Sequence, residues 1–173
     1  EWLGLKKIRN IIVRLTLVLT IFGVVLSTLH QSSLGALFMI APSKLHPLWY
    51  SGYLPVYFFV SSIFAGMSMV IFEVSLAHRY LHHKMDETHL AESEGVALGF
   101  AKAAAFMMMG YVGIKVIGLA IYNSWHYLAT GWGAWFLLEQ FCFVALPAFS
   151  YALAARERNL RLARWTAAWS VLG

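Results

Sequence analysis

The sequence predicts an all-α fold, a polytopic transmembrane helix bundle with four full spans and the start of a fifth. Hydrophobic residues make up 60% of the chain and charged residues 12%, whereas soluble domains carry about 25% charged residues. The apolar residues gather in stretches of about 20 residues or more, which is the length that a helix needs to cross a hydrocarbon core of roughly 30 Å. The one cysteine, Cys142, excludes a disulfide within the chain.

Residues 1–173 are expected to form a single transmembrane bundle. The apolar runs, and the residues that interrupt them, predict where each span and loop begins and ends. The first run follows a basic segment and ends at polar residues; prolines then favour a loop, and charged residues separate the second run from the third. The chain begins with Glu1 and its last apolar run stops short of a full span, so we expect a fragment of a larger subunit. The expected elements are a first span at 11–29, an outer loop at 30–55, a second span at 56–77, an inner loop at 78–95, a third span at 96–122, a fourth span at 132–155 and the start of a fifth at 165–173.

Lysine and arginine residues predict the direction of the spans, because membrane proteins place them mainly in cytoplasmic loops. The outer loop holds only Lys44, and the connection at 123–131 holds no formal charge. This alternation predicts a cytoplasmic N-terminus and accounts for the net charge of +5 without a nucleic-acid partner, since the basic residues flank spans. Those expected on the inner side are Lys6, Lys7, Arg9, Arg14, Arg79, Lys84, Arg156, Arg158, Arg161 and Arg164.

Four polar residues follow the first span directly: His30, Gln31, Ser32 and Ser33. One interpretation is structural, because carbonyl groups at a helix end need hydrogen-bond partners and serine is a favoured first cap of a following helix. The other is functional. The expected outer loop is long and contains a second histidine, His46, and long ordered loops often carry binding or catalytic residues.

The run STLHQSSLGALFMIAP at 27–42, followed by HPLWY and then VIFE, resembles the HybB-like branch of the NrfD/PsrC family of quinone-reactive membrane subunits. The resemblance implies a multi-pass subunit of eight or more helices in the inner (cytoplasmic) membrane of a bacterium or archaeon. It implies menaquinone or ubiquinone as the substrate, and no haem or iron–sulfur cluster in this chain. The implied partners are an iron–sulfur electron-transfer subunit on the periplasmic side and further catalytic subunits, of hydrogenase or sulfur-compound reductase type.

A histidine suits the chemistry of a quinone, because its ring gains and loses a proton near neutral pH and can also donate a hydrogen bond to a carbonyl oxygen. We therefore expect His30 to bind the quinone and to transfer protons. Gln31 and Ser33 are expected to orient the ring, and His46 or His126 are weaker candidates from the same membrane face.

Besides Arg14 in the first turn of its span, four charged residues lie within the expected spans, where ionisable side chains are costly and often mark functional pathways. Counted from the ends of their spans, Glu73 and Lys102 lie at an inner level and Lys115 and Glu139 at an outer level. We expect an ion pair at each level, because a buried charge needs a partner. Such pairs suit a proton path, and they also suit a purely structural bundle. The resemblance to HybB-like proteins, which tend to carry acidic residues at these places, implies that Glu73 and Glu139 carry protons in proton translocation.

Two other functions remain open from the sequence. A b-type cytochrome anchor would ligate haem with histidines from different helices, and a passive anchor or ion carrier would use no quinone. The inner loop also contains a histidine pair at helical spacing, His78 and His82, with His83 and His89 nearby. A hydrated loop of mixed charge is the simpler interpretation of these histidines, because metal sites need three or four ligands, so we expect no metal site.

Overall fold

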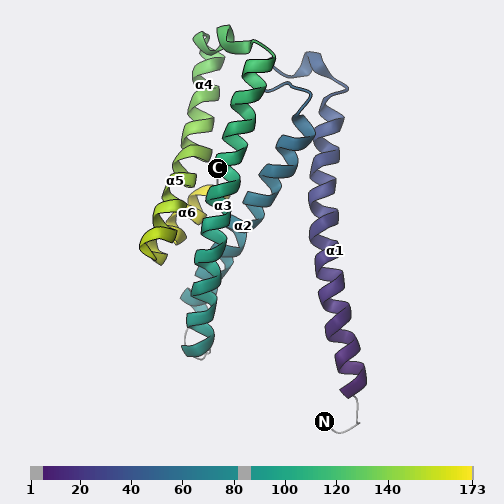
Figure 1. Ribbon diagram of the computed structural model, residues 1–173, viewed down its shortest axis with the longest axis vertical. Helices are drawn as coiled ribbons and strands as arrows, with labels where there is room; N and C mark the ends of the chain where they lie inside the picture. Colours follow the sequence, from purple (N-terminus) through teal and green to yellow (C-terminus); the bar gives the residue numbers. More distant parts are fainter. Residues whose placement is uncertain (1–5, 82–86, 173) are drawn as a thin grey trace.

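A computed structural model describes residues 6–81 and 87–172, and these residues form helices and turns without any strand (Figure 1). The all-α prediction is therefore confirmed. The α-helices are α1 at Lys6–Phe38, α2 at Leu54–Leu81, α3 at Glu87–Ile121, α4 at Gly131–Glu139, α5 at Leu146–Glu157 and α6 at Leu160–Leu172. Shorter elements are the 3-10 turns η1 at Pro42–Lys44 and η3 at Ser124–Ala129, and the π-helix η4 at Gln140–Ala145.

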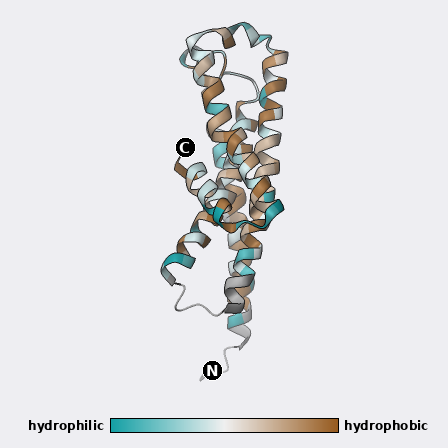
Figure 2. Cartoon of the chain, turned by 90° about the vertical axis from the view of Figure 1, so that its left-hand side faces the viewer, coloured by the Kyte–Doolittle hydropathy of each residue, from teal (hydrophilic) through white to brown (hydrophobic). Residues whose placement is uncertain are grey.

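Within the described residues, four helical stretches are long and apolar enough to cross a membrane: Ile11–Phe38, Leu54–Tyr80, Glu92–Ile121 and Gly131–Glu157. Figure 2 shows hydrophobic residues along much of the length of these helices. We call the end of the bundle that carries residues 39–53 and 122–130 the upper end, as drawn in Figure 1, and the opposite end, with the turn from α5 to α6, the lower end.

The first span is longer than the sequence suggested, because α1 continues through the polar residues to Phe38. The Ser33 hydroxyl donates to the carbonyl of Leu29 within the helix, and the Ser32 hydroxyl donates to the carbonyl of Pro55 at the start of α2, at 3.1 Å. Serine hydroxyls can bond in this way without ending a helix. The expected outer loop at 30–55 is thus shortened to residues 39–53.

The other bounds differ for local reasons. The expected inner loop at 78–95 is largely helical, since α2 runs to Leu81 and α3 starts at Glu87. Helix α6 begins at Leu160 rather than at 165, because Arg158 takes a left-handed conformation (φ 51°) that ends α5 and the Asn159 side chain accepts from the backbone N–H of Leu162, as a first cap does.

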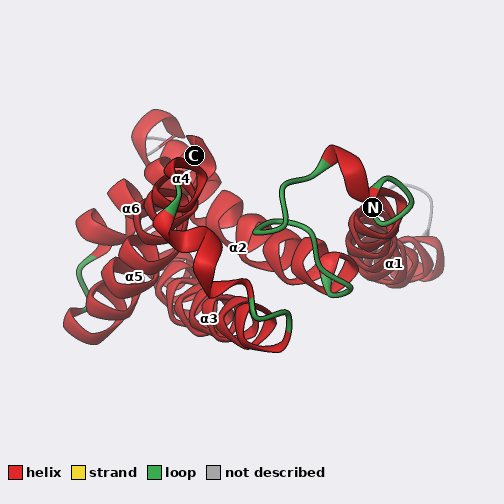
Figure 3. Cartoon of the chain, turned by 90° about the horizontal axis from the view of Figure 1, so that it is seen from above, coloured by secondary structure: helices red, strands yellow, loops and turns green. Residues whose placement is uncertain are grey.

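Helices α2, α3, α5 and α6 pack into one bundle, whereas α1 lies to one side and packs mainly against α2 near the upper end (Figures 1 and 3). Small residues line the contacts within the bundle, as expected where membrane helices approach closely. The fully buried alanines are Ala101, Ala104, Ala148, Ala154, Ala163 and Ala167. Gly35 likewise allows α1 to approach α2 closely, because at this glycine α1 contacts the backbone of Leu54 and Pro55 at the start of α2.

The fourth span is interrupted in its middle by η4. Pro147 follows this segment, and a proline lacks the N–H that an α-helix needs. The N–H of Leu146 bonds the carbonyl of Phe141, five residues back, in place of Cys142. The indole of Trp169 in α6 donates to the carbonyl of Cys142 at 3.0 Å, so the carbonyl that the π-turn releases is still bonded.

Candidate functional site

A cavity of about 250 Å³ lies at the upper end, between the end of α1, the start of α2, the upper half of α3 and the end of α4. We call it the upper cavity. Its wall is mainly aromatic and aliphatic, with few polar groups. The residues that line it are Phe38, Leu45, Trp49, Leu54, Tyr57, Phe58, Ser61, Tyr111, Lys115 and Glu139.

Lys115 brings a positive charge to the wall of the upper cavity. The residue is only 8% exposed, and its Nζ atom lies 4.3 Å from the centroid of the Tyr57 ring, 5.7 Å from that of Tyr111 and 5.6 Å from that of Phe136. Aromatic faces attract a cation at such distances. The rings therefore stabilise the ammonium group, which makes no hydrogen bond to another residue in the described part of the chain.

Glu139 brings a negative charge to the same cavity from the last turn of α4. The indole Nε1 of Trp49 donates to Oε2 of Glu139 at 2.8 Å, and the side chain of Gln140 donates to Oε1 at 3.5 Å. Trp49 belongs to the 39–53 segment, so the chain folds back over the end of α4 to hold this carboxylate. The site thus depends on a contact between residues 90 positions apart.

The acid and the base face one cavity without touching each other. The expected ion pair between Lys115 and Glu139 is wrong, because within the described ranges 6–81 and 87–172 no salt bridge within 4.0 Å joins them. Each charge is held by aromatic groups instead, Lys115 by tyrosine faces and Glu139 by an indole N–H. The space between the two is therefore suited to a ligand that accepts from one and exchanges a proton with the other.

His46 lies beside this site, in an aromatic cluster at the upper end. Its ring is 5.8 Å from that of Trp49, 5.5 Å from that of Tyr127 and 6.0 Å from that of Trp132, centroid to centroid. The Nδ1 atom accepts from the backbone N–H of Leu48 at 3.3 Å, which in a neutral ring leaves the proton on Nε2. His46 is therefore one aromatic ring removed from Glu139.

Neither His46 nor the other predicted quinone ligands line the upper cavity. His30, Gln31 and Ser33 are exposed on α1, and His30 lies eight residues before the end of that helix rather than at its outer end. His126 is exposed in η3, where its Nδ1 lies 3.2 Å from the carbonyl oxygen of Asn123. The structure thus brings together Glu139 and His46 but not the histidine that the sequence favoured.

The expected inner ion pair is also wrong. Glu73 in α2 and Lys102 in α3 are both exposed, and no salt bridge joins them in the described part of the chain. Lys102 instead lines a shallow apolar cavity with Phe106 and Arg156, on the α5 side of α3.

Sequence reasoning missed the three aromatic residues of the upper cavity that contact its charged groups: Tyr57, Tyr111 and Trp49. A signal for one of them was present, since Tyr111 precedes Lys115 by four positions and therefore lies on the same helix face. Tyr57 and Trp49 carry no such signal, because their place depends on how α2 and the 39–53 segment pack against α3 and α4.

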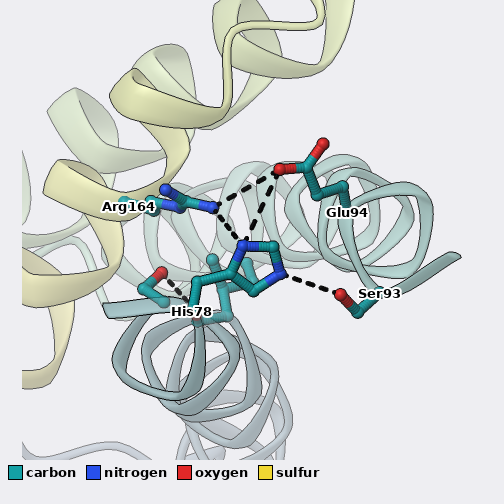
Figure 4. Close-up of polar contacts among 6 residues, drawn as sticks. His78, Ser93, Glu94 and Arg164 are labelled. Atoms are coloured by element: carbon teal, nitrogen blue, oxygen red, sulfur yellow. Dashed lines mark hydrogen bonds and ion pairs between the residues drawn. The ribbon is translucent and has the colours of Figure 1, made fainter. Parts of the chain in front are cut away.

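The lower end holds a second polar cluster, drawn in Figure 4. His78 in α2 is 9% exposed; its Nε2 lies 2.9 Å from Ser93 Oγ and its Nδ1 lies 3.1 Å from a guanidinium nitrogen of Arg164 in α6. The carboxylate of Glu94 in α3 lies 3.6 Å from Arg164 and 3.8 Å from His78. His78 thus ties three helices together, whereas its expected companions His82 and His83 lie outside the described residues.

Comparison with known proteins gives three findings. Residues 1–172 match the family described as polysulphide reductase, NrfD. A protein of Nitratidesulfovibrio vulgaris (strain Hildenborough), whose name states no function, is 67% identical over the whole chain, which covers 45% of that protein. The probable Ni/Fe-hydrogenase 2 b-type cytochrome subunit of Escherichia coli (strain K12) is 47% identical over 55 residues, 31% of this chain and 14% of that subunit. The chain therefore spans less than half the length of these two relatives. No solved structure matches.

Proposed function

Because the chain belongs to the NrfD family of membrane subunits of redox complexes, we propose that it binds a membrane quinone in the upper cavity and exchanges electrons between this quinone and a partner iron–sulfur protein. The observation that carries the proposal is the facing pair Lys115 and Glu139, one base and one acid on the wall of an otherwise mainly apolar cavity.

The size and lining of the cavity support a quinone ring. Its volume of about 250 Å³ is just below the roughly 300–1,000 Å³ of sites that enclose drug-sized ligands, so it suits the ring and not the whole lipid. Apolar walls with a few convergent polar groups are typical of such sites. Tyr57, Tyr111 and Phe58 provide flat faces for the ring.

The two charged groups match the two ends of a quinone. The Lys115 ammonium group would donate a hydrogen bond to one carbonyl oxygen, which becomes more negative when electrons arrive. Glu139 would take up protons from water one at a time and pass them to the reduced quinone, and it would accept them back when the quinol is oxidised. Two electrons from the partner and two protons convert the quinone to a quinol, and the Trp49 indole would hold Glu139 in place throughout.

The basic residues support an orientation for this chemistry. Within the described ranges, Arg79, Arg156, Arg158, Arg161 and Arg164 lie toward the lower end, whereas Lys44 is the one formally charged lysine or arginine in the upper connections at 39–53 and 122–130. By the positive-inside tendency, the lower end would be cytoplasmic, in a bacterial or archaeal inner membrane. The iron–sulfur partner would then dock at the upper end, close to the cavity. The local similarity to a hydrogenase subunit supports a hydrogenase-type complex.

Substitution of the facing pair tests the proposal in the assembled complex. Lys115→Met and Glu139→Gln are each expected to lower quinone-linked turnover by about tenfold or more, since a hydrogen bond to a charged group contributes roughly 1.5–3 kcal/mol and 1.4 kcal/mol corresponds to a factor of ten. Lys102→Met is the matched control, because Lys102 is an exposed lysine of the same helix outside the upper cavity. Equal turnover in all three variants, at equal amounts in the membrane, would contradict the proposal.

The predicted role of His30 is tested in the same assay. His30 lies outside the upper cavity, so the present proposal expects His30→Ala to retain turnover. A large loss of turnover with normal assembly would instead favour the interpretation drawn from the sequence.

A haem function is the alternative that the comparison favours, because the relative from E. coli is named a b-type cytochrome subunit. His46 and His126 lie at the upper end, and both rings contact that of Tyr127, at centroid distances of 5.5 and 3.9 Å. An absorption spectrum of the purified protein separates the two functions. A haem band lost in His46→Ala would favour the cytochrome, whereas a spectrum without haem bands would favour the quinone subunit.

A further inference from the structure

A larger cavity of about 570 Å³ opens at the lower end, between α2, the start of α3 and α6. We propose that this lower cavity binds an anionic membrane phospholipid, with the phosphate at its polar mouth and an acyl chain along its apolar wall. This inference is independent of the quinone site, which lies at the opposite end of the bundle.

The position of the cavity along the helices matches the level of lipid head groups. Arg79 lies at the lower limit of the span Leu54–Tyr80, and Glu94 lies at the lower limit of the span Glu92–Ile121. Arg164 lies in the second turn of α6, close to the turn that joins it to α5. All three belong to the border between the apolar spans and water, where phosphate groups of a bilayer lie.

The charges at the mouth favour an anion. Arg164 shares its guanidinium group between Glu94 and the ring of His78, so Glu94, the one acid among the described residues that line the cavity, is already compensated. Arg79 also lines the cavity and is exposed, and it makes no hydrogen bond or ion pair with another residue in the described part of the chain. One guanidinium group therefore remains for a phosphate, which it can bind through two parallel hydrogen bonds.

The apolar wall explains why the ligand is a lipid rather than a free anion. Phe72 and Leu76 lie four positions apart on α2, and Trp165 and Ala168 lie three positions apart on α6, so each pair forms a stripe along its helix. Leu76 is 46% exposed and Trp165 is 78% exposed. The stripes run from the charged mouth toward the middle of the membrane, as an acyl chain does, and basic pockets between membrane helices are known places for acidic lipids.

Lipid retention in the purified, full-length protein tests this inference. The protein is exchanged into nanodiscs that contain phosphatidylglycerol or phosphatidylcholine, and bound lipid is measured by native mass spectrometry after release. Phosphatidylglycerol is expected to be retained and phosphatidylcholine to be lost. Arg79→Gln is expected to lower retention about tenfold, the effect of losing one charge-assisted hydrogen bond.

Arg161→Gln is the matched control, because Arg161 is an exposed arginine of α6 that does not line the cavity. It is expected to retain phosphatidylglycerol like the unchanged protein. Glycerol phosphate, which carries the head group without acyl chains, is expected not to displace the lipid. Equal retention in the two arginine variants, equal retention of the two lipids, or displacement by glycerol phosphate would each overturn the proposal. Failure here leaves the turnover test of Lys115 and Glu139 unaffected.

Discussion

Substitution of Gly35 by alanine tests how α1 is attached to the rest of the bundle. A Cβ atom at this buried position would lie 2.8 Å from the carbonyl oxygen of Leu54 and 2.9 Å from Cα of Pro55. Ordinary contacts of a Cβ atom begin at 3.4 Å. Both obstructing atoms belong to backbone and cannot rotate away, so α1 and α2 must separate by about 0.5 Å.

The expected change in stability follows from two opposing terms. Overpacking a close contact costs roughly 1–3 kcal/mol, whereas replacing glycine by alanine inside a helix gains about 0.5–1 kcal/mol. The net effect of Gly35→Ala is therefore a loss of up to about 2.5 kcal/mol in the free energy of unfolding. Gly23→Ala in the same helix meets no atom within 4 Å, so it shows only the gain and is expected to raise stability.

The measurement is thermal unfolding in detergent, followed by circular dichroism for the unchanged protein and both variants. The midpoint should fall for Gly35→Ala and rise for Gly23→Ala. Quinone-linked turnover should also fall for Gly35→Ala, because Phe38 and Leu54 line the upper cavity and would move apart. Midpoints that shift in the same direction would refute the close approach of α1 and α2 at this glycine.

Two further substitutions address the upper cavity. Trp49→Phe keeps an aromatic ring but removes the N–H that bonds Glu139, so turnover should fall about tenfold at unchanged protein yield; unchanged turnover would show that the carboxylate needs no such support. Gly118→Ala places a Cβ atom against the hydroxyl of Tyr57, whereas Gly113→Ala meets nothing within 4 Å. The first should raise the KM for quinone by displacing the Tyr57 ring and the second should not, and equal KM values would mean that this ring does not shape the site.

Most of the fold could be predicted from the sequence, because the length and apolarity of a span are local properties of the chain. The four spans were found in their correct order, with different ends. The end of α1 differs from the expected one, because a polar side chain does not by itself mark a helix terminus. Ser32 instead bonds to Pro55 in α2, and a partner so distant in the sequence is invisible to a local pattern.

The candidate site could be predicted only in part. The depth of Lys115 and Glu139 within their spans follows from counting residues, and both line the upper cavity. What holds each charge does not follow from depth, because it depends on the direction in which each helix faces and on the path of the 39–53 segment. The expected role of His30 could not be judged from the local sequence for the same reason. The local sequence does not show which face of α1 packs against other helices.

The π-turn at Gln140–Ala145 has a consequence for how this span tolerates changes in length. A π-turn holds one residue more than an α-turn, so removal of one residue between 140 and 145 would leave an α-turn in its place, in which Pro147 still donates no backbone hydrogen bond. Glu139 above and Tyr151 below would then keep their present directions. Removal of one residue elsewhere in the span would rotate everything beyond it by about 100°, the angle per residue of an α-helix. Homologues that lack a residue in this span should therefore lack it at η4.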